Sequence, residues 1–293
     1  MGSLVFGFTN RNKENSTAVE KGKVIALLNQ KGGVGKTTMA YNLAFALATT
    51  GKKVLCIDFD PQANLTHLFG GLEENKDSVS IFQMLINSIK ELKKLHTAAF
   101  LSDAILEKGP VDLIASSQEL SGFDLTVAGI NRPRQMILKN FIDKNGLTDI
   151  YDYIVIDGPP TLGLLVVNIL CAANGVLIPF QADQFSRVGL EHFHQTLEDI
   201  DDMGLVPSPK IIGYIPNLVD QRRKQTKEDF SAIKNDLGMS NITARIFDPF
   251  FNRASLSKAG SLGKSVFEFK NKDFMELQKQ FENMAIHIQE TLE

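Results

Sequence analysis

The chain has 293 residues, 43% apolar and 22% charged, and its 31 Lys and Arg against 34 Asp and Glu give a formal net charge of −3. This composition is typical of a globular protein and too apolar for a disordered chain. No apolar stretch approaches the roughly 20 residues that span a bilayer. The two cysteines lie far apart, which excludes a disulfide framework and predicts a cytoplasmic protein. The slightly negative net charge also argues against a nucleic-acid partner.

The N-terminal residues 1–22 are expected to form a flexible leader, because 9–22 are polar and lack apolar periodicity. The remaining residues, 23–293, are expected to form one domain in which apolar runs alternate with segments of helical periodicity. Strands are predicted at 24–29, 54–59, 111–115, 153–157, 175–180, 210–215 and 244–247. Helices are predicted at 37–50, 134–145, 162–174, 186–203 and 272–293. Because the strands are apolar throughout, both of their faces should be covered, and we predict a doubly wound, mainly parallel α/β sheet flanked by helices.

A glycine-rich segment, QKGGVGKTT at 30–38, follows the first predicted strand and precedes a helix. Its glycines allow successive backbone N–H groups to surround a phosphate, and the helix N-terminus adds a positive dipole end. Lys36 would contact the β- and γ-phosphates, and the Thr37 hydroxyl would bind Mg²⁺. The usual pattern has a further glycine where Gln30 stands, and a second lysine, Lys31, precedes the glycine pair.

Carboxylates follow two of the predicted strands. Asp58 and Asp60 come at the end of the second strand, before Pro61, and Asp157 ends the strand YIVID. The carboxyl ends of parallel strands are the edge at which α/β sheets bind ligands, so we expect these carboxylates beside the phosphate loop. The five histidines show no metal-ligand spacing, and Cys56 and Cys171 lie in apolar segments that predict core positions.

The segments KGGVGKTT, IDFDPQ (57–62) and YDYIVIDGPPTLG (151–163) together resemble the ParA/MinD family of deviant Walker A P-loop ATPases. Within it, the chain is most similar to the Soj-like ParA ATPases that partition chromosomes or plasmids. The resemblance implies that ATP and Mg²⁺ are the cofactors and that two chains enclose two ATP molecules in a sandwich dimer. It covers 23–290 and weakens after about residue 215.

The resemblance also assigns roles to residues. The nucleotide-binding set is Lys31, Gly32, Gly33, Val34, Gly35, Lys36, Thr37, Thr38 and Asn217. Lys31 would reach the partner's nucleotide, Lys36 would act on the phosphates, and Asp60 would position or deprotonate the attacking water. Thr37, Asp58 and Asp157 would surround Mg²⁺, Asp157 through water. Asn217 would hydrogen-bond adenine, although an asparagine after a strand is also a common turn residue.

The charge is unevenly distributed along the chain. Residues 203–272 hold 12 Lys and Arg against six Asp and Glu, whereas the last 21 residues hold five acids and one base. An acidic terminal helix is repelled by the anionic membrane surface that MinD-like members bind, so no stable membrane association is expected. The basic stretch predicts nonspecific DNA binding, although scattered solvated bases give the same composition. The candidate DNA contacts are Arg222, Arg223, Lys224, Lys227, Arg253, Lys258 and Lys264.

The sequence therefore predicts a nucleoid-associated, ParA-type ATPase whose homodimer binds DNA nonspecifically and is released when a ParB-like centromere-binding or cargo adaptor protein stimulates slow ATP hydrolysis. Two alternatives remain at this point. One is a MinD-like membrane-associated spatial regulator, and the other is a ParA-like protein that positions a cargo other than DNA. The leader is too short for a helix-turn-helix domain, which disfavours operator binding.

Overall fold

The architecture comes from a computed structural model, which describes residues 21–71, 79–89, 101, 104–220, 222–239, 244–251 and 254–293. The expected leader therefore lies almost wholly outside the described residues, as does Arg253. A central sheet runs in the order β3-β4-β2-β5-β1-β6-β7-β8. Its strands are β1 Lys23–Leu27, β2 Val54–Asp58, β3 Ile105–Lys108, β4 Val111–Ile114, β5 Tyr153–Asp157, β6 Gly175–Phe180, β7 Lys210–Pro216 and β8 Arg245–Ile246.

The pairing of the strands confirms the predicted doubly wound sheet. All neighbouring strands pair in parallel except β3, which pairs antiparallel with β4 at one edge. In the register, Asp58 of β2 lies beside Asp157 of β5. Leu27 of β1 is the other neighbour of Asp157. The order of connections reverses on either side of β1, so the segment that follows β1 lies at the position where such sheets bind ligands.

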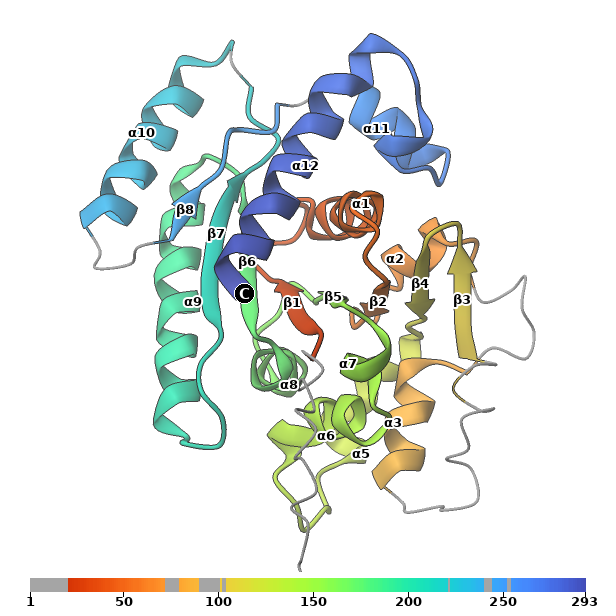
Figure 1. Cartoon of the computed structure of the whole chain (residues 1–293). Coiled ribbons are helices and arrows are strands. Elements are labelled where there is room, and N and C mark those ends of the chain that lie inside the picture. Colours follow the sequence, from red (N-terminus) through yellow and green to blue (C-terminus); the bar gives the residue numbers. More distant parts are fainter. Residues whose placement is uncertain are drawn as a thin grey trace, which may run out of the picture.

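Helices cover both faces of the sheet (Figure 1). Their bounds are α1 Lys36–Thr49, α2 Asn64–Leu68, α3 Ile81–Ile89, α5 Phe123–Thr126, α6 Ile137–Lys144, α7 Leu147–Ile150, α8 Leu164–Ala172, α9 Gln184–Asp202, α10 Lys224–Met239, α11 Ala254–Ser261 and α12 Lys272–Leu292. Short 3₁₀ helices lie at Gln118–Gly122, Arg134–Met136 and Val266–Glu268. The helices α1, α2, α11 and α12 pack on one face, and α3 and α5 to α10 pack on the other.

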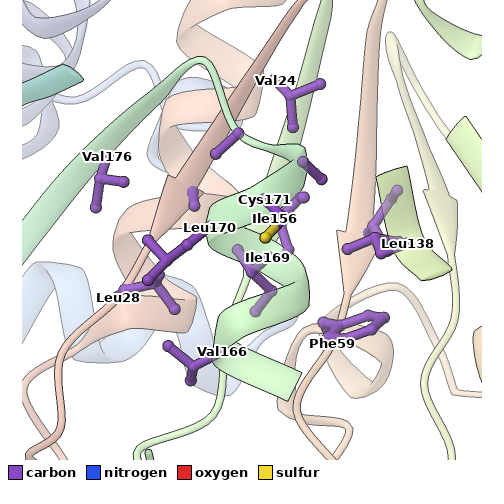
Figure 2. Packing of buried hydrophobic residues seen from close by; sticks show 14 of the residues in the cluster. Val24, Leu28, Phe59, Leu138, Ile156, Val166, Ile169, Leu170, Cys171 and Val176 are labelled. Carbon is purple, nitrogen blue, oxygen red and sulfur yellow. The ribbon is translucent and has the colours of Figure 1, made fainter. Parts of the chain in front are cut away.

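Two apolar cores, one on each face, hold the helices against the sheet. Figure 2 shows part of one of them, where Val166, Ile169 and Leu170 of α8 lie against the sheet near Leu28. Cys171 belongs to this core, and Cys56 is fully buried in the other, which confirms both as core residues. Because the strands have apolar side chains on both faces, neither helical layer can leave without exposing the sheet.

The structure adds elements that the periodicity did not predict, namely β3, α2, α3, α5, α7, α10 and α11. It also ends β2 at Asp58, so Asp60 lies in the following turn rather than on the strand. The expectation that both Asp58 and Asp60 end the second strand is therefore wrong for Asp60. The backbone N–H of Asp60 instead donates to Asp58 Oδ1 over 3.2 Å, so a local turn sets the position of Asp60.

Candidate functional site

The glycine-rich loop joins β1 to α1 at the carboxyl edge of the sheet (Figure 1). Gly33 and Gly35 have positive φ, 74° and 89°, in the left-handed region that favours glycine. A Cβ atom on Gly35 would lie 2.2 Å from Asn217 Nδ2, so a side chain is excluded there by space as well as by dihedral angle. Gly35 occupies the N-cap position of α1, whose free N–H groups face the loop.

The loop is fixed from outside by side chains of neighbouring segments. Asn217 follows β7, is 1% exposed, and donates from Nδ2 to the carbonyl oxygen of Val34 over 2.7 Å. Its Oδ1 is buried without a hydrogen-bond partner. Gln181 donates from Nε2 to the carbonyl oxygen of Gly33 over 3.2 Å. Asn217 thus supports the loop through Nδ2, and its free acceptor Oδ1 is available for a ligand.

The two lysines of the loop have different surroundings. Lys36 is 7% exposed, and its Nζ donates to the carbonyl oxygens of Asn29 at 3.2 Å and Lys31 at 3.3 Å. Burial lowers the pKa of Lys36, and the charges of Asp157 and Asp60 oppose this shift. Lys31 is partly exposed and its Nζ forms an ion pair with Asp183, at the N-cap of α9.

Asp183 was not predicted from the sequence. Its Oδ1 accepts a hydrogen bond from the backbone N–H of Ser186 over 3.0 Å, which caps α9, while Oδ2 faces Lys31. Burial alone would raise the pKa of Asp183, but the hydrogen bonds from Lys31 and Ser186 outweigh it and lower the pKa. The available signal was the Asp at 183 with Ser at 186, a usual helix start, but nothing in the sequence connects it to Lys31.

Thr37 and Asp157 meet at the base of the loop. The Thr37 hydroxyl donates to Asp157 Oδ2 over 2.6 Å, and Asp157 Oδ1 is buried without a partner. Burial raises the pKa of Asp157, as does the charge of Asp58, whereas Thr37 and Lys36 act against the shift. A buried carboxylate with an unused oxygen beside a hydroxyl suits Mg²⁺, which prefers oxygen ligands and retains several waters. No group of three or more His, Cys, Asp or Glu able to hold a metal occurs among the described residues.

Asp58 lies beside Asp157 and is fully buried. Its Oδ2 accepts hydrogen bonds from Thr66, over 2.8 Å from the backbone and 2.7 Å from the hydroxyl. Burial raises the pKa of Asp58 to about 6, although the bonds from Thr66 and Asp60 oppose the shift. The protein thus uses most of the acceptor capacity of Asp58, and its contact with the metal predicted from sequence stays a prediction.

Asp60 is 7% exposed, and it lines the pocket at the phosphate loop. Its backbone carbonyl accepts hydrogen bonds from the Ser116 hydroxyl, over 2.7 Å, and from the N–H of Ala63, over 2.9 Å. Ser116 also donates from its backbone to the Thr66 hydroxyl, so Asp58 and Asp60 are held by one network. The sequence did not predict Ser116 or Thr66, because their roles depend on a fold contact between distant segments.

An open pocket of about 440 Å³ lies at the phosphate loop. Its lining comprises Gly32, Gly33, Gly35, Lys36, Thr37, Thr38, Asp60, Gln62, Asn64, Leu68 and Pro160. Most of the phosphate-loop residues predicted from sequence therefore share one cavity with the predicted catalytic carboxylate. A second hollow of about 230 Å³ lies between α9 and α10, next to His194, and shares no lining residue with the first. Only the larger one has the chemistry of a phosphate site.

The candidate DNA contacts fall on two segments. Arg222 and Arg223 directly precede α10, with side chains 94% and 78% exposed, and both approach Asp220 at 3.6 Å. Lys224 and Lys227 are exposed in the first turn of α10, and Lys258 and Lys264 lie on α11 and in the turn after it. Val219 forms an isolated parallel bridge with Phe251. The bridge shows that the two basic segments leave the same region of the sheet.

The terminal helix α12 packs its apolar side into the core between α1 and α11 (Figure 1). Phe274, Leu277 and Phe281 are at most 2% exposed. Among the helices of the described residues, none has the length and apolarity that crossing a bilayer requires. The apolar face of α12 is therefore occupied by the protein itself.

Comparison with known proteins places this chain in a family. The model described as an AAA domain, AAA_31, matches residues 22–207. The Soj chromosome-partitioning ATPase of Treponema pallidum is 33% identical over 252 residues, which are 85% of this chain and 90% of that protein. The ParA chromosome-partitioning protein of Myxococcus xanthus is 30% identical over 254 residues, covering 86% and 83% of the two chains.

A solved structure is similar over nearly its whole length. It is that of a candidate plasmid partition protein of Borrelia burgdorferi bound to AMPPNP, with a TM-score of 0.71 and 25% identity, covering 92% of this chain and 100% of that one. The phosphate loop, the strand-end carboxylates and the parallel sheet agree with these similarities. This chain therefore belongs to the ParA/MinD family of P-loop ATPases, among relatives named ParA and Soj.

Proposed function

We propose that residues 23–293 form a single ParA-type ATPase domain that binds ATP and Mg²⁺, dimerises around ATP, binds DNA nonspecifically and leaves it after slow hydrolysis stimulated by a partner. The observation that carries the proposal is the Thr37–Asp157 hydrogen bond of 2.6 Å under the glycine-rich loop, with the second Asp157 oxygen unpartnered. The relatives that partition chromosomes, and the Borrelia structure with AMPPNP, support the same function.

The loop would bind the triphosphate through its backbone. The N–H groups of Gly32 to Thr38 and the N-terminus of α1 provide donors, and Lys36 exchanges its two backbone carbonyl partners for phosphate oxygens. The Nδ2 group of Asn217 already donates a hydrogen bond to the carbonyl oxygen of Val34. Its acceptor Oδ1 has no partner, so this is the atom that would accept a hydrogen bond from the amino group of adenine.

Thr37 and Asp157 would hold Mg²⁺, Thr37 through its hydroxyl and Asp157 through water. When bound, the ion supplies positive charge to the β- and γ-phosphates and offsets the charge of the buried carboxylates. Asp58 would lie behind this site, oriented by Thr66. Asp60 would orient or deprotonate the attacking water, since its backbone is fixed by Ser116 and it lines the pocket.

The homodimer would place Lys31 against the nucleotide of the partner subunit. Two facing triphosphates repel each other strongly, and a cation from each chain offsets that repulsion. Lys31 is paired with Asp183 of its own chain, so dimerisation would exchange one anionic partner for another.

Exposed bases at the start of α10, and Lys258 and Lys264 near α11, are the proposed contacts with DNA phosphates. Arg253 remains a candidate by sequence alone. A ParB-like adaptor would stimulate hydrolysis, and DNA binding would make the protein nucleoid-associated. The buried apolar face of α12 favours this function over membrane binding.

A gel shift on random-sequence duplex DNA tests the proposal. With ATP and Mg²⁺ the wild-type chain should shift the DNA, and Lys36→Ala should not, because it loses the phosphate contact. Asp60→Ala should remain bound after the wild type has hydrolysed its ATP and dissociated. DNA that never shifts in any nucleotide state would refute DNA binding, and sedimentation with anionic liposomes would then support the membrane alternative.

The double variant Arg222→Glu/Arg223→Glu tests the proposed surface. It should weaken DNA binding and lower the slope of log affinity against log salt by about one per lost phosphate contact, with ATP hydrolysis unchanged. The matched control is Lys139→Glu/Lys144→Glu, with the same charge change on α6, which lies away from α10 in the same helical layer (Figure 1). Equal losses in both double variants would show an effect of net charge only.

A further inference from the structure

Lys108, at the end of β3, joins three segments that are distant in sequence. Its ammonium group donates to the carbonyl oxygens of Leu68, at the end of α2, and of Gly263, in the turn after α11, the latter over 2.6 Å. The same group lies 5.7 Å from the ring centre of Tyr41 on α1 and 5.8 Å from that of Phe69. These contacts, called the Lys108 clamp below, take no part in the function proposed above.

The Gly263 side of the clamp is rigid. Gly263 has a φ of +60°, and its carbonyl oxygen accepts a second hydrogen bond, 3.0 Å from the Tyr41 hydroxyl. The turn is bonded back to α11, since the N–H groups of Leu262 and Lys264 both donate to the carbonyl oxygen of Ala259. Moving Gly263 therefore moves α11 and the two bases that this segment carries, Lys258 and Lys264.

The Leu68 side of the clamp reaches the nucleotide pocket. Leu68 itself lines that pocket, together with Asp60 and Asn64. Its helix, α2, has five residues, and Thr66 in its middle donates twice to Asp58. So short a helix, bonded at its centre to the strand-end carboxylate, should shift as one body with the Asp58–Asp60 turn.

We propose that Lys108 is a positioning residue that couples the nucleotide pocket to α11. A change of the Asp58–Asp60 turn on nucleotide binding displaces α2, and the clamp passes that displacement from the Leu68 carbonyl to the Gly263 carbonyl and so to Lys258 and Lys264. The use of this coupling in DNA binding rests on the proposed function, whereas the coupling itself depends only on nucleotide binding.

Hydrogen exchange of the full chain, with and without AMPPNP and Mg²⁺, tests the coupling without DNA. In the wild type the nucleotide should slow exchange in peptides from 60–71 and also in peptides from 256–266. Lys108→Met keeps the length of the side chain but removes its donors, so the first response should remain and the second should disappear. The proposal is overturned if the nucleotide does not slow exchange in 256–266 of the wild type, or if it slows exchange there equally in Lys108→Met.

Two further variants separate coupling from loss of fold. Lys108→Arg keeps the charge and supplies donors to both carbonyls, and it should restore the 256–266 response. Tyr41→Phe removes one of the two donors to Gly263 and should reduce that response without abolishing it. The matched control, Lys139→Met, removes a half-buried lysine that pairs with Asp143 on α6, and it should behave as the wild type. Failure of Lys108→Arg to restore the response also counts against the clamp.

DNA binding provides the second measurement. In Lys108→Met the ratio of DNA affinity with AMPPNP to that with ADP should fall several-fold toward one. If Lys108 instead contacted DNA directly, affinity would fall equally with both nucleotides while the exchange response persisted, and this result would overturn the proposal. Chains that show the exchange response but bind no DNA would refute the proposed function and leave the coupling standing.

Discussion

At Gly35 of the phosphate loop, both the backbone dihedral angle and a neighbouring atom restrict which residue fits. Gly35 combines a left-handed backbone with a side-chain amide, Asn217 Nδ2, at the position where its Cβ would stand. Gly51, just after α1, has a similar φ of 81° but no atom within 4 Å of a Cβ placed there. A substitution at Gly51 would therefore cause dihedral strain alone, whereas one at Gly35 would add a steric clash with Asn217.

We predict that Gly35→Ala reduces affinity for an ATP analogue more than tenfold, because the methyl group displaces Asn217 and distorts the loop. Gly51→Ala should lower the free energy of unfolding by about 1–2 kcal/mol, the cost of a left-handed alanine, with affinity unchanged. Isothermal titration calorimetry and urea unfolding measure the two quantities. Equal affinities in the two variants would contradict the role given to Asn217.

At the scale of elements, a hydrogen bond between His194 and Tyr214 connects α9 to β7. His194 Nε2 lies 2.6 Å from the Tyr214 hydroxyl, and burial lowers the pKa of His194 despite the opposing charges of Glu198 and Glu191. Arg187 and Asp236, which form an ion pair between α9 and α10, line the same hollow. The native protein therefore holds His194 neutral at a pH where an unfolded chain would protonate it.

The effect of pH on stability depends on whether the native or the unfolded chain binds more protons. Between the lowered pKa of native His194 and about 6.5 the unfolded chain binds more protons, so stability should fall as pH drops below about 6.5. His194→Gln should make the free energy of unfolding less dependent on pH between pH 7 and 5, as measured by urea unfolding. His192→Gln, at an exposed position two residues earlier, is the control. An unchanged pH dependence in His194→Gln would exclude this residue as the cause.

The sequence predicted the buried strands and the longer amphipathic helices, and it missed elements that bury few apolar side chains. All seven predicted strands are present, and those inside the sheet were recognisable because strands covered on both faces are apolar throughout. The edge strand β3, ILEK, has four residues, two of them charged, and no such signal. Among the α10 residues whose burial the structure describes, 224–237, Ile233 and Leu237 are the buried apolar ones, which is too few for a helical stripe to be recognised.

The same contrast holds for the site. The glycine-rich loop and Asp157 were predictable as candidate site residues, because each belongs to a local sequence motif. Thr66, Ser116 and Asp183 were not, since each acts on a residue that the fold brings to it from elsewhere in the chain. Local patterns contain the groups that bind a ligand, whereas the groups that orient them depend on tertiary structure.

At the scale of the molecule, the Lys31–Asp183 pair should oppose the proposed dimer. A partly exposed ion pair is worth up to about 1 kcal/mol, which is roughly a fivefold change in an equilibrium constant. Asp183→Asn keeps an acceptor for the α9 cap but loses the charge, so ATP-dependent dimers should form at several-fold lower protein concentration. Sedimentation velocity with ATP measures this, and Lys31→Ala should stay monomeric. Weaker dimerisation of Asp183→Asn would mean that Asp183 supports the dimer.

The two edges of the sheet limit how copies of this chain can assemble. One edge is the four-residue strand β3, which carries Glu107 and Lys108, and the other is the two-residue strand β8. Short or charged edge strands are poor templates for adding a further strand from another molecule. Within the described residues, the sheet therefore offers little for fibrous, cross-β growth. Copies of this chain, the proposed dimer included, should therefore meet through helices and loops and not by extension of the sheet.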